Sequence, residues 1–237
     1  DNAWKYSGKT ENARIEFGHT LQPDPCPSLE LTLKDARNTQ AYVDFFRRHR
    51  VRVVNMSFGG SVGGVEEQLE QCGIGANADE RRKIAREWFD IGKDAFVRAM
   101  ASAPEVLSVA AAGNENADSS FAESIPADIV LPNLITVGAV DKAGDEAPFT
   151  SYGKTVVVHA NGYLVDSVIP GGERLAESGT SMSAPQVTNL AAKILAVNPA
   201  LTPPQVIAII RETAEKTDDG RRVLIHPRKA IAAAQAK

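Results

Sequence analysis

Residues 179–185, Gly-Thr-Ser-Met-Ser-Ala-Pro, place a serine where it could act as a nucleophile. The small and apolar residues that follow predict a helix from Thr180 to about Asn198, with Ser181 in its first turn. A helix N-terminus has N–H groups without intrahelical partners, and its dipole favours developing negative charge. Pro185 is tolerated there because an N–H at that point has no acceptor. Taken alone, the segment is explained more simply as an ordinary serine or threonine cap.

Asn114 supplies a second group suited to the same chemistry. It follows residues 106–112, whose apolar character predicts a strand covered on both faces. An asparagine at the carboxyl end of a parallel strand can direct its amide into the crevice where doubly wound sheets bind ligands. A hydrogen bond from there to an oxyanion contributes roughly 3–4 kcal/mol to acyl transfer. The alternative is a turn asparagine, which is common.

Glycines after a third predicted strand indicate a surface that a peptide backbone could approach. Residues 51–56 predict the strand, and Ser-Phe-Gly-Gly follows at 57–60, with two more glycines at 63–64 that we expect to be flexible. Glycines there would let a substrate backbone come close and pair with the strand edge.

The elements that must position these residues alternate along the chain. Strands are predicted at 13–17, 51–56, 106–112, 134–140 and 155–160, and helices at 31–50, 79–101, 180–198, 203–215 and 228–237. Alternating helices and apolar strands predict an α/β domain around a largely parallel sheet.

Composition excludes several classes of protein. The chain is 43% hydrophobic and 24% charged, which argues against disorder. A net charge of −4 gives no reason to expect nucleic acid or an anionic membrane as a partner. No apolar stretch approaches the roughly 20 residues that cross a bilayer. Cys26 and Cys72 are too few for a disulfide framework, and whether they pair is left open.

Four ordered segments resemble the subtilisin-like serine proteases, or subtilases (peptidase S8 family). They are Val-Asn-Met-Ser-Phe-Gly-Gly at 54–60, Ala-Ala-Gly-Asn-Glu at 111–115, Ile-Thr-Val-Gly-Ala-Val at 135–140, and the serine segment at 179–185. The resemblance covers residues 51–215 and implies the subtilase three-layer α/β sandwich, a mostly parallel central sheet with helices on both faces. We therefore expect residues 1–237 to form one partial catalytic domain, with a divergent segment at 1–50, a recognisable core at 51–215 and a tail at 216–237.

The resemblance also implies a role for each matching residue of a serine endopeptidase. Ser181 resembles the nucleophile and Asn114 the side-chain oxyanion donor, with the backbone N–H of Ser181 as second donor. The residues that resemble the walls of the substrate cleft are Ser57, Phe58 and Gly59 on one side and Ala111, Ala112 and Gly113 on the other. Two stretches depart from the family: residues 66–79 look like an insertion, and His-Ala-Asn-Gly at 159–162 replaces the common Met-Ala-Pro-Gly.

The aspartate and histidine motifs of the subtilase triad, Asp-Ser/Thr-Gly and His-Gly-Thr, are absent from this sequence. His19 lies between a predicted strand and a Pro-rich loop, whereas the family's base opens a helix of small residues. His49, His159 and His226 are interpreted as surface or structural residues. We expect both motifs upstream of Asp1, so the chain would be a fragment with little activity by itself. Its expected partners are a polypeptide substrate and the missing N-terminal part of the same domain.

There are two alternatives to a serine endopeptidase. A catalytically inactive pseudoprotease or peptide-binding module is the main alternative, and the sequence upstream of Asp1 would discriminate. A serine esterase is disfavoured because no Gly-x-Ser-x-Gly elbow surrounds Ser181. No cofactor or metal site is predicted, although the resemblance allows calcium, because no acidic cluster has a convincing ligand spacing. The resemblance slightly favours a secreted or cell-envelope location.

Overall fold

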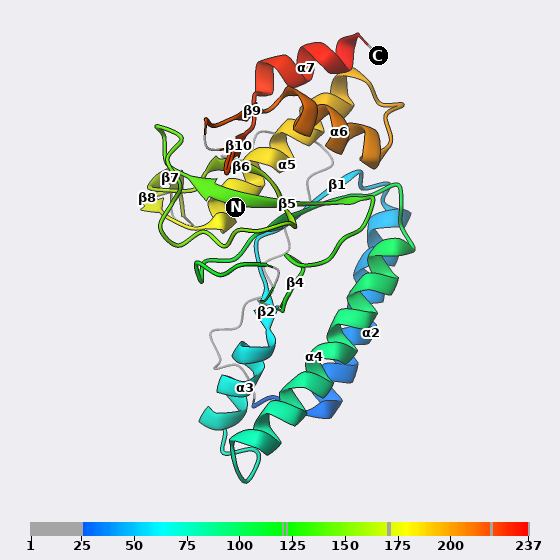
Figure 1. Ribbon diagram of the computed structural model, residues 1–237. Coiled ribbons are helices and arrows are strands. Elements are labelled where there is room, and N and C mark those ends of the chain that lie inside the picture. Colours follow the sequence, from blue (N-terminus) through cyan, green and yellow to red (C-terminus); the bar gives the residue numbers. More distant parts are fainter. Residues whose placement is uncertain (1–25, 120, 122, 170–171, 219, 237) are drawn as a thin grey trace.

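The computed structural model describes residues 26–236 except positions 120, 122, 170–171 and 219 (Figure 1). The strand predicted at 13–17 and the histidine at 19 lie outside the described residues.

A six-stranded sheet forms the centre of the fold. Its order is β1 (Val53–Met56), β3 (Leu107–Ala111), β5 (Leu134–Val140), β6 (Val156–Asn161), β10 (Val223–Leu224) and β9 (Glu215–Lys216). The neighbours from β1 to β10 are parallel, and β9 runs antiparallel to β10. Every residue of β3 and β5 is buried, as their apolar sequences predict for strands covered on both faces.

One face of the sheet is covered by α5 (Thr180–Val197), α6 (Pro203–Thr213) and α7 (Pro227–Gln235). Small residues such as Ala184 and Ala191, both fully buried, bring the axis of α5 close to the strands. Thr202 and Gln205 form a capping box that fixes where α6 begins.

The other face is covered by α2 (Leu29–Arg48) and α4 (Ala78–Ala101), which run side by side and extend well beyond the sheet (Figure 1). Ser28 and Asn77 cap the two helices through their side chains. Helices on both faces of a mainly parallel sheet confirm the predicted three-layer α/β architecture.

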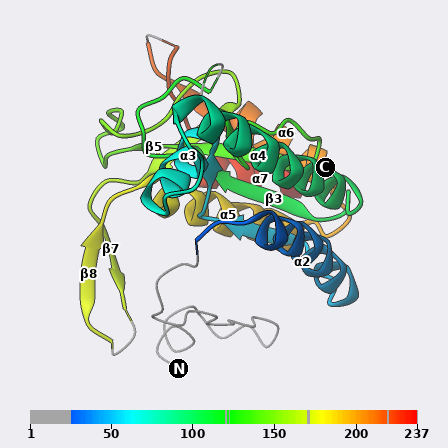
Figure 2. The same ribbon diagram turned by 90° about the horizontal axis from the view of Figure 1, so that it is seen from below.

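Several shorter elements were not predicted. They are α3 (Val62–Gln71), the paired strands β2 (Gly60–Ser61) and β4 (Ser124–Ile125), the hairpin of β7 (Val165–Val168) and β8 (Arg174–Glu177), which projects from the body in Figure 2, and the strands β9 and β10. The expectation of a flexible glycine segment at 63–64 is wrong. These glycines lie in the first turn of α3, because the Oγ of Ser61 accepts a hydrogen bond from the N–H of Gly64 at 3.1 Å.

Cys26 and Cys72 form a disulfide, which answers the question that the sequence left open. Within the described ranges, no helix has both the length and the apolar character needed to span a bilayer.

Candidate active site

A cleft of about 780 Å³ opens beyond the carboxyl ends of β1 and β3, beside the start of α5. It brings together residues that lie far apart in the sequence. Of the predicted site residues, those that line it are Phe58, Gly59, Ala111, Ala112, Gly113, Asn114 and Ser181. The structure therefore places the proposed nucleophile and the proposed oxyanion donor at one cavity.

Ser57 is the predicted site residue that lies beside this cleft without lining it. Its Oγ donates to the carbonyl oxygen of Ser181 at 2.8 Å and accepts from the Nδ2 of Asn55 at 2.9 Å. Ser57 therefore braces the turn that carries Ser181. Thr188 extends the chain of contacts, because its hydroxyl donates to the Oδ1 of Asn55 at 3.2 Å.

Ser181 is half-buried in the first turn of α5. Among the described residues, no group is hydrogen-bonded to its hydroxyl. As the second residue of the helix, its backbone N–H has no intrahelical acceptor. Gly179 anchors the turn by donating its N–H to the carbonyl oxygen of Gly162 at 2.8 Å. The hydroxyl and the N–H are both available to a group bound in the cleft.

The carboxamide of Asn114 is held in one orientation by the residue before the serine. Its Oδ1 accepts from the backbone N–H of Thr180 at 2.8 Å and from the Thr180 hydroxyl at 3.0 Å. The Thr180 Oγ1 in turn accepts from the N–H of Gly113 at 3.1 Å. Because a backbone N–H can only donate, its partner must be the amide oxygen, and the Nδ2 group is left to donate elsewhere.

Two donors, the Nδ2 group of Asn114 and the N–H of Ser181, thus border the same cleft beside a serine hydroxyl. Such donors can stabilise the negative charge that develops on a carbonyl oxygen during nucleophilic attack. The arrangement still needs a base that accepts the serine proton.

None of the three described histidines lines the cleft. His49 caps the C-terminus of α2 and is exposed, and His226 caps the N-terminus of α7. His159 is buried in β6, 4% exposed, and its Nδ1 accepts from the N–H of Val223 at 3.2 Å. These positions agree with the surface and structural roles expected from the sequence.

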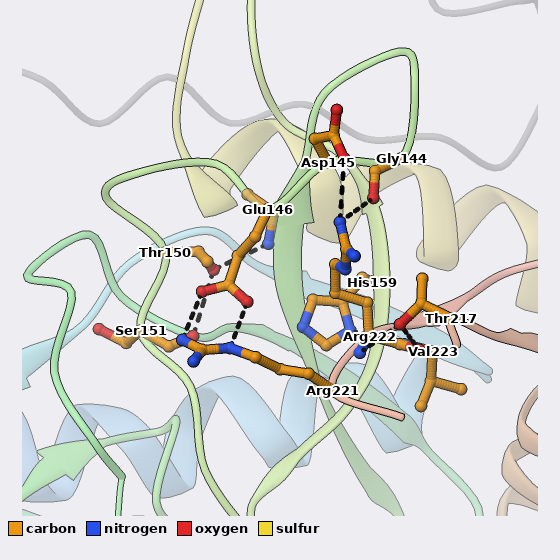
Figure 3. Close-up of polar contacts among 11 residues, drawn as sticks. Gly144, Asp145, Glu146, Thr150, Ser151, His159, Thr217, Arg221, Arg222 and Val223 are labelled. Atoms are coloured by element: carbon orange, nitrogen blue, oxygen red, sulfur yellow. Dashed lines mark hydrogen bonds and ion pairs between the residues drawn. The ribbon is translucent and has the colours of Figure 1, made fainter. Parts of the chain in front are cut away.

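The surroundings of His159 are polar on one side (Figure 3). The carboxylate of Glu146 forms a two-point ion pair with Arg221, at 2.6 and 2.7 Å, and Arg222 donates to the carbonyl oxygen of Gly144 at 3.0 Å. Burial lowers the pKa of His159, Glu146 opposes the shift, and the two arginines lower the pKa further. The imidazole is therefore a neutral structural acceptor that joins β6 to β10.

Carboxylates rather than imidazoles lie along the cleft wall. Glu123 forms an ion pair with Arg86, whose hydrogen bond lowers the pKa of the glutamate. The pKa of Asp128 is raised by burial, although hydrogen bonds from Ser124 oppose the shift. Glu115 folds back toward Ser151, whose hydroxyl donates to its Oε2 at 3.3 Å.

The outer wall of the cleft was missed by the sequence reasoning. It consists of α3 and the exposed ring of Phe121, and the residues of α3 that line the cleft are Val62, Gly63, Gly64, Val65 and Gln68. The apparent insertion at 66–79 signalled an added segment here, but not that it would border the cleft.

Ser181 also lines a second groove, of about 620 Å³, between the β7–β8 hairpin and α5. Its apolar lining includes Val168, Leu175, Met182 and Pro185. The serine therefore stands at the junction of two grooves.

Within the part of the chain that the structure describes, no group of three or more His, Cys, Asp or Glu residues is placed to hold a metal ion.

The structure defines a three-layer α/β protein with a serine at a helix N-terminus and a carboxamide beyond a strand end, both at one cleft. Comparison with known proteins narrows this class. The chain belongs to the subtilase family, whose peptidase S8 model matches residues 21–226.

Relatives and solved structures agree with this assignment. Subtilisin from Bacillus pumilus is 38% identical over 109 residues, covering 46% of this chain and 39% of the relative. Alkaline elastase YaB from Bacillus sp. (strain YaB) is 31% identical over 170 residues, covering 69% of this chain and 42% of the relative. This chain thus spans less than half the length of either curated relative.

Among solved structures, a cold adapted subtilisin-like serine proteinase superposes with a TM-score of 0.58 at 25% identity, covering 81% of this chain and 61% of that one. The prenylagaramide maturation protease PagA gives 0.62 at 21% identity, covering 85% and 68%. The second likeness supports the fold alone.

Proposed function

We propose that this chain supplies the nucleophile and oxyanion-binding half of a serine endopeptidase. The observation that carries the proposal is that Ser181 and Asn114 border one cleft, with the Asn114 amide turned by Thr180 so that its Nδ2 group can donate.

In the proposed reaction, the Ser181 oxygen attacks the carbonyl carbon of a peptide bond and its proton passes to a base. The carbonyl oxygen becomes an oxyanion that accepts hydrogen bonds from the Nδ2 group of Asn114 and the N–H of Ser181. Proton transfer to the leaving amine breaks the C–N bond and leaves an acyl-enzyme. Water then hydrolyses that ester and restores the serine hydroxyl.

The base and its acidic partner are proposed to come from a further segment of the same domain, upstream of this chain. Two features support a docking place beside the serine. Among the described strands β1 pairs with β3 alone, so its other edge is open. On α5, which packs against β1, the side chains of Pro185, Asn189 and Ala192 are exposed. A strand added in parallel to β1 would end near Ser181, because the carboxyl ends of parallel strands share one edge.

The Cys26–Cys72 disulfide supports a secreted or cell-envelope location, because disulfides persist in oxidising compartments. No cofactor is proposed. Peptide binding without hydrolysis is the second candidate, favoured by the lack of a histidine in the cleft among the described residues.

Fluorophosphonate labelling tests the proposal on the protein that includes its natural upstream residues. We expect covalent labelling that Ser181→Ala abolishes. The matched control is Ser183→Ala: Ser183 is fully buried in the same helix turn and its hydroxyl has no partner, so labelling should persist. Labelling that survives Ser181→Ala would refute the nucleophile assignment. A labelled Ser181 without peptide hydrolysis would favour the binding module.

A further inference from the structure

Helix α3 forms an apolar wall of the cleft, which two exposed aromatic rings also line. Val62 and Val65 line the cavity from α3, and Phe58 and Phe121 line it as well, with 61% and 85% of their surface exposed. Large apolar side chains exposed at a cleft gain free energy when a ligand covers them. A large apolar side chain of a bound peptide could therefore contact the wall and the rings together.

Non-covalent contacts hold α3 mainly along one side, where it packs against α4. Leu69 is its one buried side chain. Glu70 pairs with Arg81 at 2.9 Å, and Glu66 with Arg82 at 3.7 Å, but one side chain of each pair is exposed, which limits what the pair contributes.

The chain entering and leaving α3 is rich in glycine. Gly59 and Gly60 precede it, and Gly73 and Gly75 follow it with φ of 65° and 88°. Glycine allows backbone rotations that other residues resist. The pairing of β2 with β4 holds the N-terminal end at Gly60, so the segment can hinge at its C-terminal end, at Gly73 and Gly75, unless it is restrained.

That restraint is the disulfide. Cys72 is the C-cap of α3, and its partner Cys26 lies just before Ser28, the N-cap of α2. The bond joins positions 46 residues apart and ties the far end of the wall to a helix that packs along α4.

We propose that the Cys26–Cys72 disulfide sets the position of α3 as a wall of the substrate cleft, so that its reduction weakens binding of peptides with a large apolar side chain. This inference rests on the proposed function, since it concerns the same cleft. Thiol–disulfide exchange with an external dithiol supplies the chemistry: the dithiol is oxidised to its disulfide and the two cysteines are reduced to thiols. The pair of Asn114 and Ser181 lies outside α3 and is unaffected.

The test measures binding of a fluorescein-labelled peptide, Phe-Ala-Ala-Pro-Phe amide, and of its analogue with both phenylalanines replaced by alanine. Fluorescence anisotropy gives the Kd for the oxidised chain, the dithiothreitol-reduced chain and the Cys26→Ser/Cys72→Ser variant. We expect the oxidised chain to prefer the phenylalanine peptide. Reduction and the double variant should each raise its Kd about tenfold, because losing one wall removes part of the apolar burial of a side chain. Dithiothreitol should not affect the double variant.

Two further variants separate the effect of the disulfide from other changes in α3. Glu70→Gln removes an exposed ion pair of α3 while leaving the disulfide, and should change the Kd less than twofold. Val65→Asp places a charge on the wall and should abolish the preference in the oxidised state. An unchanged Kd on reduction, with native circular dichroism, would overturn the inference, as would equal binding of the two peptides by the oxidised chain.

Failure of the proposed function is a separate outcome, because it appears in Ser181 labelling. If Ser181 is not labelled but reduction still raises the Kd of the peptide, the protein is a peptide-binding module. If Ser181 is labelled but reduction leaves the Kd unchanged, only the inference about α3 is wrong.

Discussion

Thr180 holds Asn114 by two hydrogen bonds, one from its backbone N–H at 2.8 Å and one from its hydroxyl at 3.0 Å, both to the Asn114 Oδ1. The contact joins the residue before the serine to the end of β3. Both bonds are accepted by the amide oxygen of Asn114, so its Nδ2 group is left to donate to a ligand. Thr180 is fully buried, so its side chain acts by positioning Asn114 and does not itself reach substrate.

The first prediction separates the donor from the residue that positions it. In the protein with its upstream residues, Asn114→Ala should lower kcat for peptide hydrolysis by about 10²–10³-fold with little change in KM, because the lost bond forms only as the oxyanion develops. Thr180→Val keeps the backbone bond and removes the hydroxyl bond, so we expect a loss of about tenfold in kcat.

Thr213→Val is the control for this series. Thr213 lies in α6 and does not line the cleft, and its hydroxyl donates to the carbonyl oxygen of Ile209 at 2.7 Å. The kcat of this variant should stay within about threefold of the unaltered protein. If Thr180→Val and Thr213→Val behave alike, the positioning role of Thr180 is wrong.

The sequence predicts the site residues that stand in motifs several residues long. Ser181 and Asn114 stand in segments whose order and spacing resemble a known family, and the structure places both at one cleft. Thr180 stands in the same segment as Ser181, but its contact with Asn114 was not predicted, because a contact between side chains 66 residues apart leaves no periodic trace. Ser57 was predicted as a cleft wall, but its hydroxyl faces the carbonyl of Ser181.

The same limit applies to the fold. The strand predicted at 134–140 is β5 without change, because a run of seven residues dominated by apolar side chains and covered on both faces gives an unambiguous pattern. The strands β9 and β10 contain two residues each, too few for any periodicity. Helix α3 carries two glycines in its first turn, so local propensity opposes it, and tertiary contacts through Leu69 and the disulfide stabilise it.

Gly138 provides a test of packing between β5 and β6. A Cβ at this position would lie 2.6 Å from the Cδ2 and 2.8 Å from the Nε2 of His159. Because both residues are buried, Gly138→Ala should lower the free energy of unfolding by about 1–3 kcal/mol. The loss should shrink when His159→Ala is already present, since that change removes the obstructing ring. Urea unfolding of the double-mutant cycle measures the coupling.

Gly60→Ala is the matched control, since a Cβ there meets nothing within 4 Å. It should change the free energy of unfolding by less than about 0.5 kcal/mol. Additive effects of Gly138→Ala and His159→Ala would show that the two positions do not compete for space.

The buried imidazole of His159 predicts a pH dependence of stability. Burial lowers its pKa below the usual value of 6.5, so the unfolded chain binds a proton more readily than the folded one. Above that value the residue is neutral in both states and stability is unaffected. As the pH falls through 6.5, the unfolded state gains protons first and the free energy of unfolding decreases, until the pH reaches the lower pKa of the folded state.

Urea unfolding midpoints between pH 7.5 and pH 5 give the slope of stability against pH. His159→Gln, which cannot titrate, should flatten it. An identical slope in His159→Gln and the unaltered protein would exclude His159 as its source.

Asn133 joins the end of α4 to the loop before β3 through one side-chain amide. It is 4% exposed, and its Nδ2 lies 3.1, 3.0 and 3.0 Å from the carbonyl oxygens of Met100, Ala103 and Val106. Its backbone carbonyl oxygen accepts from the N–H of Ser108 at 2.8 Å. Asn133→Ala would remove a donor from all three carbonyls. Those of Met100 and Ala103 keep a backbone donor, so the loss falls chiefly on Val106, and a buried group without a donor costs about 1–3 kcal/mol.

We therefore expect Asn133→Ala to lower the free energy of unfolding by about 3 kcal/mol, and Asn133→Asp to lower it more, because a carboxylate would face the same carbonyl oxygens. Asn198→Ala is the control: its Nδ2 makes one bond, to the carbonyl oxygen of Ala234 at 3.3 Å, so the loss should be about 1 kcal/mol or less. Urea unfolding followed by circular dichroism ranks the three variants. Equal losses for Asn133→Ala and Asn198→Ala would mean that the carbonyls at the end of α4 find other donors, and that Asn133 does not hold the helix to the sheet.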